Sequence, residues 1–581
     1  MIDQRLQRAF ATGYERLAAW SDLLDAINVY PVADADTGSN LTVSLSPLHR
    51  VDAGVDRTVQ KLLASALGNS GNIASGFFTG FIAGDPRTDI RRAARAGRDM
   101  AWKALADPKP GTMLTVFDEL ATRLAHAPPD LPPGACAAVV EHLEKTVHST
   151  RETLPALKAA GVVDAGALGI FLFMEGFFGS LAGQAHGFRP VTEIFKQGLK
   201  LPADFTPDRH GGYCIDTVVQ MGKGFESALE ELAACGESVV IRREDDHVKI
   251  HLHTERREDV RRRLEGLGRV VRWSEQDMSQ QAGQRTDPVQ PSAIHVVTDA
   301  AGSITRQEAG RLGMTLLDSY IIVGDTSLPE SFFPPAELYA LMRQGVKVST
   351  AQASVFERHQ RYENILCRCH SALYLCVGSV YTGNFRTVSA WKERNDPDGR
   401  LKVIDTGAAS GRLGIAARAT ARYAQQTDDA ERVIRFAEAA VRTSEEYIFL
   451  DRLHYLAAGG RLSKTKGFLG DMFHMKPVIT PAAEGACKVG TVRSRSEQIE
   501  FALGKLEQRL GRKAGALIMI EYSDNREWVE GAVLPRIQDR YDSAEVALCP
   551  LSLTSGAHMG PGTWGVAFLP PVIDPTPSPF R

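Results

Sequence analysis

Residues 28–40 read NVYPVADADTGSN, and this stretch governs the interpretation of the whole N-terminal part of the chain. Asp34 and Asp36 stand two positions apart in a loop bounded by proline and glycine, so their carboxylates can converge on one hard cation. In phosphoryl-transfer sites Mg²⁺ is held by one or two carboxylates, with phosphate and water completing its shell. An Asx-rich turn that caps the next helix explains the same pair. Asp34 and Asp36 are therefore candidate Mg²⁺ ligands, with a structural turn as the alternative.

Three further segments contain glycine beside polar residues. The segment 68–71 reads GNSG and precedes an apolar helix, so its backbone N–H groups can approach phosphate closely. Gly111 and Thr112 begin another predicted helix with a free hydroxyl, and Asp164 stands beside glycines in VDAGALG, 163–169. Taken alone, GNSG is more often a helix cap than a phosphate site.

The first two hundred residues have a helical pattern. Apolar residues recur every three or four positions from Leu6 to Ile27, as on one stripe of a helix. Similar patterns cover 59–67, 113–124 and 138–147, and the Pro/Gly break PPDLPPG separates the last two. This region is therefore predicted to be nearly all α-helical.

In this order, the four segments resemble the ATP-binding DhaL domain of the dihydroxyacetone kinase family, in its fatty acid kinase branch, over residues 1–200. The resemblance implies an antiparallel helical barrel that binds ATP and Mg²⁺ at one end. It implies that Asp34 and Asp36 are catalytic Mg²⁺ ligands, with Asn28 near the metal. It places seven residues around the nucleotide: Asn40, Asn69, Ser70, Gly71, Thr112, Asp164 and Gly166.

Three positions depart from the pattern of that family. Ala33 and Ala35 replace a proline and a glycine beside the aspartates, and Leu67 stands where an arginine is usual. Alanine at 35 restricts the backbone of the loop, and the missing arginine weakens phosphate neutralisation. None of these changes removes a metal ligand.

The segment 205–281 is predicted to be a small α+β middle domain. SVVIRREDDHVKIHLHT reads as a hairpin that turns at 244–247, and its second strand puts His251 and His253 on one face. Cys214 and Asp216 share a face of the strand YCIDTVV. Cys with two His suits Zn²⁺, with Asp216 as a fourth ligand or a supporting partner. The alternative is a pair of exposed histidines and an unrelated buried cysteine.

This segment resembles the middle domain of the bacterial fatty acid kinases, which carry Y-C-T-E-F and H-V-H-T patterns. The resemblance implies a structural Cys/His metal cluster and a dimerisation surface, so a homodimer is expected. A second Cys/His run, Cys367-Arg368-Cys369-His370, is interpreted as the end of a helix.

After a predicted linker at 282–291, residues 292–581 alternate short apolar strands (IHVVTD, ALYLCVGS, KVIDT and ALIMIEY) with helical segments. Such alternation is typical of an α/β domain. The region resembles the DegV family of fatty-acid-binding proteins through Ser349-Thr350, Tyr381-Thr382-Gly383, Gly459-Gly460-Arg461 and His558-Met559-Gly560-Pro561-Gly562.

The DegV resemblance implies two α/β lobes that close over a tunnel for one long-chain fatty acid. It implies that Thr350, Thr382 and His558 bond the head group, with Gly383 beside them, and that Arg461 and Arg493 lie near the phosphoryl-transfer face, Arg461 as a catalytic residue. This region has T-A-Q-A-S and T-G-N-F where the family has T-S-Q-P-S and S-G-T-Y, so acyl-chain preference is left open.

Composition narrows the class of protein. A chain of 581 residues requires several domains, and a net charge of −3 argues against a nucleic-acid partner and allows at most peripheral membrane contact. Eight cysteines without a secretory signal indicate reduced thiols, so a cytoplasmic protein is expected.

The combined expectation is a fatty acid kinase that forms an acyl phosphate for a downstream acyltransferase. Three alternatives stay open: a lipid-binding regulatory protein with an inert kinase half, a kinase for a small substrate such as dihydroxyacetone, and a Zn²⁺ hydrolase centred on Cys214, His251 and His253.

Overall fold

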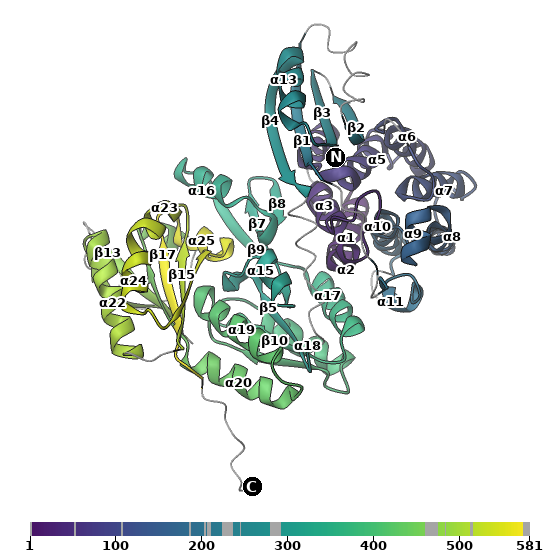
Figure 1. Ribbon diagram of the computed structural model, residues 1–581. Helices are drawn as coiled ribbons and strands as arrows, with labels where there is room; N and C mark the ends of the chain where they lie inside the picture. The colour runs from purple at the N-terminus through teal and green to yellow at the C-terminus, as the bar shows by residue number, and fades with distance from the viewer. Residues whose placement is uncertain are drawn as a thin grey trace. The chain divides into compact units, whose positions relative to one another are not determined.

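The chain forms two compact units, Met1–Arg285 and Thr286–Arg581 (Figure 1). The computed structural model describes residues 3–51, 54–105, 108–184, 187–202, 205, 211–222, 236–244, 246–278, 292–458, 475–482, 484–511 and 515–572. The predicted linker at 282–291 lies outside the described residues.

The first part of unit 1 is helical, as the periodicity predicts. The stripe from Leu6 to Ile27 is buried, but it belongs to two helices that are separated at the buried, non-helical Trp20. The helices are α1 (Gln4–Ala19), α2 (Ser21–Ala26), α3 (Thr37–Ser44), α4 (Val55–Ser65), α5 (Gly68–Ala83), α6 (Ile90–Lys103), α7 (Met113–Ala125), α8 (Pro133–Thr153), α9 (Pro155–Ala160), α10 (Ala165–Leu181) and α11 (Val191–Ile194), with a 3₁₀ turn at Ser46–Arg50.

The helices α5 and α10 are apolar nearly all round because they form the centre of the helical part. Phe77 of α5 stacks on Phe117 of α7 with ring centroids 4.0 Å apart. Gly13 of α1 lets that helix approach α10, since a Cβ there would lie 2.7 Å from the carbonyl oxygen of Phe173. With the core packed in this way, the N-termini of α3, α5, α7 and α10 line one cavity.

The middle part of unit 1 is a four-stranded antiparallel sheet in the order β2-β3-β1-β4. The predicted hairpin is confirmed, because Glu244 pairs with His247 across its turn. Val248, Ile250 and Leu252 of β3 pack with the apolar face of the helix α13. The elements are β1 (Tyr213–Met221), β2 (Glu237–Glu244), β3 (His247–Thr254), α13 (Arg257–Leu267) and β4 (Gly268–Asp277).

Unit 2 is an α/β structure with three sheets. A parallel sheet has the order β11-β10-β5-β6, a mixed sheet the order β14-β13-β12-β17-β15-β16, and a small antiparallel sheet the order β8-β7-β9. The strands are β5 (His295–Asp299), β6 (Thr315–Leu317), β7 (Ser319–Val323), β8 (Thr326–Pro329), β9 (Val348–Gln352), β10 (Ala372–Cys376), β11 (Leu401–Asp405), β12 (Glu445–Phe449), β13 (Lys476–Ala482), β14 (Gly485–Val492), β15 (Leu517–Tyr522), β16 (Glu545–Pro550) and β17 (Trp564–Leu569).

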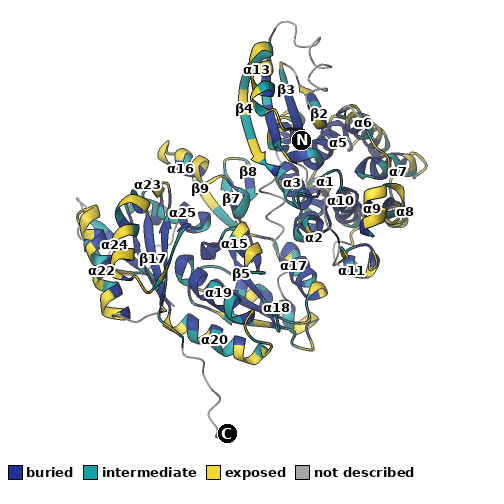
Figure 2. Cartoon of the chain, in the orientation of Figure 1, coloured by how far each residue is buried: buried dark blue, intermediate teal, exposed yellow. Residues whose placement is uncertain are grey.

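Helices of unit 2 cover its sheets, and α20 and α22 are buried on one side and exposed on the other (Figure 2). The helix α17 ends at Arg368 with Cys369 as its C-cap, which confirms the interpretation of 367–370 as a helix end. The helices are α15 (Arg306–Arg311), α16 (Pro335–Arg343), α17 (Val355–Arg368), α18 (Asn384–Asn395), α19 (Ser410–Ala424), α20 (Ala430–Thr443), α21 (His454–Ala458), α22 (Arg495–Leu510), α23 (Arg526–Trp528), α24 (Leu534–Arg540) and α25 (Leu553–Met559).

Among the helices of the described part of the chain, none combines the length and the apolar character needed to cross a membrane.

Candidate active site

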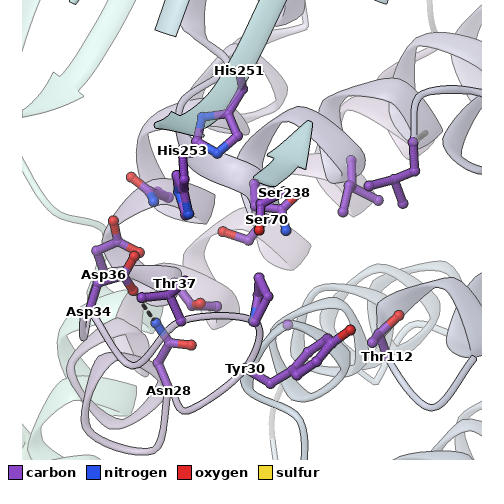
Figure 3. A pocket seen from close by; sticks show the side chains of 18 of the residues that line it. Asn28, Tyr30, Asp34, Asp36, Thr37, Ser70, Thr112, Ser238, His251 and His253 are labelled. Atoms are coloured by element: carbon purple, nitrogen blue, oxygen red, sulfur yellow. Dashed lines mark hydrogen bonds between the residues drawn. The ribbon is translucent and has the colours of Figure 1, made fainter. Parts of the chain in front are cut away.

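A cavity of about 400 Å³ in unit 1 collects most of the predicted kinase residues (Figure 3). It lies where four helices begin, so unpaired backbone N–H groups and the positive ends of helix dipoles face it. The predicted residues that line it are Asn28, Asp34, Asp36, Asn40, Asn69, Ser70, Thr112, Asp164 and Gly166, together with Cys214, His251 and His253. Such a lining is suited to an anion that is accompanied by a cation.

Asp34 and Asp36 lie together at the start of α3, and the Asn28 Nδ2 donates to Asp34 Oδ1 at 2.6 Å. Burial raises the pKa of Asp34. Burial, followed by repulsion from Asp34, raises the pKa of Asp36 well above its usual range. Two carboxyl groups that repel each other at one point form a donor set that fits Mg²⁺, which would offset the repulsion.

The predicted phosphate loop divides between two roles. Gly68, with φ +62°, contacts Asn40, because a Cβ at 68 would lie 2.1 Å from Asn40 Nδ2. Asn69 and Ser70 line the cavity, and Asn69 Oδ1 is buried with no hydrogen-bond partner in the described part of the chain. Gly71 instead faces α3, where a Cβ would lie 2.0 Å from Ser44 Oγ. Gly71 therefore permits the packing of α5 on α3.

Thr112 and Asp164 are both helix caps and cavity residues. Thr112 Oγ1 accepts from the N–H of Leu114 at 3.3 Å, and Asp164 Oδ1 accepts from the N–H of Ala167 at 2.7 Å. Burial raises the pKa of Asp164 to about 7. Gly166 leaves room for Met113, since a Cβ at 166 would lie 2.5 Å from Met113 Cε.

The middle domain contributes a cluster of metal-ligand type to the same cavity. Ligand atoms of Cys214, His251 and His253 all lie within 4.8 Å of one another. Both histidines are buried, at 0% and 7% exposure, so the alternative of exposed histidines is wrong. His251 Nε2 has no hydrogen-bond partner among the described residues, which leaves this atom for a metal. The donor set fits Zn²⁺ with one position to spare.

Asp216 supports this cluster rather than joining it. Its Oδ2 lies 3.3 Å from His251 Nδ1 and accepts from the N–H of Gly68 at 3.0 Å. Its Oδ1 accepts from Asn72 Nδ2 at 3.1 Å. Asp216 therefore orients the His251 ring and attaches the middle domain to the start of α5.

A second cavity, of about 520 Å³, lies in unit 2 and is lined by Thr350, Thr382 and Gly383. Thr350 Oγ1, on β9, is 3.1 Å from Nε2 of His558, on α25, so three predicted head-group residues and their neighbour Gly383 come together.

Two predicted arginines are not among the residues that line the second cavity. Arg493 is exposed beyond the end of β14, and its backbone N–H donates to Glu497. Arg461 lies outside the described residues.

Sequence reasoning missed Tyr30, Lys109 and Ser238, which also line the first cavity. Lys109 is the one lysine or arginine among the described residues that line it, so it can supply positive charge that Leu67 does not. The signal for Lys109 was its place two residues before Gly111 of a recognised segment. No local signal marks Ser238, which stands in an ordinary strand pattern.

Three domain families match the chain in succession. The DAK2 domain matches residues 31–179, the FakA-like middle domain of fatty acid kinase matches 210–285, and the DegV family matches 293–571. Protein YloV of Bacillus subtilis is 31% identical over 301 residues, and an uncharacterised protein of Staphylococcus haemolyticus is 30% identical over 298 residues. Each alignment covers 46% of this chain and 54% of the relative, so the chain spans about half the length of these relatives.

Among solved structures, a DegV family protein of Thermus thermophilus described as binding fatty acid is 22% identical with a TM-score of 0.45, covering 48% of this chain and 99% of that one. DegV of Bacillus subtilis, described as a fatty acid binding protein, is 18% identical with a TM-score of 0.43, covering 48% and 100%.

The N-terminal half thus has the domains of the kinase class: a DAK2 domain followed by a FakA-like middle domain. More particularly, this chain joins those two domains to a DegV domain in one polypeptide.

Proposed function

We propose that this protein is a Mg²⁺-dependent kinase that transfers the γ-phosphoryl group of ATP to the carboxylate of a fatty acid. The observation that carries the proposal is the convergence of Asp34, Asp36 and the N-termini of four helices on one cavity. Aspartates for a cation and N–H groups for phosphate are the parts that phosphoryl transfer requires.

The acceptor needs no general base. A carboxylate with a pKa near 4 is ionised at neutral pH, so one of its oxygens can attack the γ-phosphorus directly. The bond from the γ-phosphorus to the β,γ-bridging oxygen breaks, and ADP leaves with that electron pair. The product is an acyl phosphate, a mixed anhydride that an acyltransferase can consume. Asp34 and Asp36 would hold Mg²⁺, which offsets the negative charge of the phosphates when bound.

The fatty acid would bind in unit 2. Thr350 and His558, which contact each other, offer a hydroxyl and an imidazole to the carboxylate. Thr382 and Gly383 lie at the same cavity. Each buried CH₂ of the alkyl chain would contribute about 0.8 kcal/mol to binding, so a long chain can be retained through purification.

The Cys214, His251 and His253 cluster would hold Zn²⁺ in a structural role. Asp216, which supports this cluster, also accepts from the backbone of Gly68 at the phosphate loop. A metal that fixes His251 would therefore help to fix the start of α5.

The decisive experiment is an acyl-hydroxamate trap with purified protein, Mg-ATP, oleate and hydroxylamine. Wild-type protein should form hydroxamate and Asp36→Asn should not, whereas Asp56→Asn, on the outer helix α4, should match wild type. Bound lipid without hydroxamate in any protein would refute the kinase proposal and favour a lipid-binding protein with an inert kinase half. Phosphorylation of dihydroxyacetone in place of oleate would favour a small-molecule kinase. A hydrolase centred on the Cys/His cluster would lose its activity on chelation but keep it in Asp36→Asn.

A further inference from the structure

Strand β2 of the middle domain is irregular where it borders the first cavity. Its pairing with β3 shifts register between Glu237 and Val240, as at a β-bulge. Within this bulge Ser238 has φ +53°, in the left-handed region that disfavours residues with a Cβ. Gly236, Glu237, Ser238 and Val239 all line the cavity. The bulge thus turns this stretch of strand toward the candidate active site.

Two other serines with positive φ show what such a conformation can provide. Ser410, with φ +53°, donates its hydroxyl to the buried Glu521 Oε1 at 3.0 Å. Ser303, with φ +56°, accepts from the N–H of Ser552 at 2.9 Å. In both cases the unfavourable backbone places a hydroxyl on a partner inside the protein. No described residue hydrogen-bonds the hydroxyl of Ser238, and that side chain lines a cavity instead.

The position of Ser238 indicates the kind of ligand. Figure 3 shows Ser238 beside Ser70, in the first turn of α5. Backbone N–H groups at a helix start and the positive end of its dipole favour a phosphate group there. A serine hydroxyl facing the same point can donate one more hydrogen bond to a phosphate oxygen.

The bulge is also held firmly against the helical part of unit 1. The Ile241 N–H donates to the carbonyl of Ala104 at 2.9 Å, and Arg242 Nη2 donates to Thr79 Oγ1 at 2.9 Å. Because β2 is attached to α5 and to the end of α6, Ser238 is preorganised toward the cavity rather than placed by chance on a loose edge.

We propose that Ser238 is a phosphate-binding residue, so that the middle domain supplies one wall of the nucleotide site in addition to its metal cluster. This inference rests on the proposed function, because it needs a nucleotide in the cavity. A hydrogen bond to a charged oxygen implies that loss of the Ser238 hydroxyl weakens nucleotide binding by about 10- to 100-fold.

Calorimetric titration of the full chain with a non-hydrolysable Mg-ATP analogue tests the proposal. Ser238→Ala and Ser238→Gly should both weaken binding about 10-fold or more, and Ser274→Ala, on β4 of the same sheet, should bind as wild type does. Adenosine should bind equally to all four proteins, because the contact is to phosphate.

Thermal unfolding of the same proteins separates binding from structure. Glycine relieves the positive φ, so Ser238→Gly should unfold at a higher temperature than Ser238→Ala and still bind the analogue weakly. Wild-type affinity in both variants would overturn the role of Ser238 while leaving the kinase proposal intact. Failure of the wild type to bind the analogue would instead refute the nucleotide site itself.

Discussion

Replacing Ala35 with glycine is expected to stabilise unit 1 by about 0.5–1 kcal/mol. Ala35 stands between the two proposed Mg²⁺ ligands and has φ +58°. The left-handed conformation costs a residue with a Cβ about 1–2 kcal/mol. Glycine avoids that cost but loses about 0.4–1 kcal/mol because its unfolded chain is freer. The difference favours glycine, so the restriction inferred from the sequence at this position becomes a measurable strain.

Urea unfolding of the full chain, followed by circular dichroism, measures this difference on the transition that the Mg-ATP analogue shifts. A domain of this size gains about 2–4 °C for each kcal/mol, so the melting temperature should rise by about 1–4 °C. Ala33→Gly is the matched control, since Ala33 is buried and its φ is not positive. That variant should destabilise unit 1 by about 1 kcal/mol. Destabilisation of Ala35→Gly to the same extent would refute the strain.

Burial raises the pKa of Glu330 from about 4.5 to about 8, so the folded state keeps a proton that the unfolded state releases. Stability should fall as the pH rises from 5 through 8, and Glu330→Gln should remove most of that fall in urea midpoints measured across this range; an unchanged slope would contradict it. Asp216→Asn should weaken zinc binding about 10- to 100-fold, because Asp216 orients His251; competition with a chromophoric chelator measures this, and wild-type affinity would argue against it. Thr350→Val and His558→Gln should each reduce fatty acid binding about 10-fold in native mass spectrometry, since each removes a donor to the carboxylate; full lipid occupancy in both would place the head group elsewhere.

Local patterns in the sequence determined most of the secondary structure and much of the site. Apolar spacing predicted the helix at 113–125, and alternation predicted the hairpin that turns at 244–247. Thr112 and Asp164 were recognisable because helix caps are short-range features. Each of these depends on residues within a few positions of one another, where steric and hydrogen-bonding preferences act directly.

Contacts between distant residues decided the remaining features. The sequence alone cannot show that Gly71 faces Ser44 while Asn69 faces the cavity, because the packing of α5 on α3 makes that choice. The burial of His251 follows from Asp216, which joins the sheet to Gly68, 148 positions away. Ser238 reaches the cavity only because a bulge turns its strand. The sequence by itself therefore determined which chemical groups are present and which elements carry them. Tertiary packing decided which of those groups meet, because burial and close approach depend on surfaces that come together only in the folded chain.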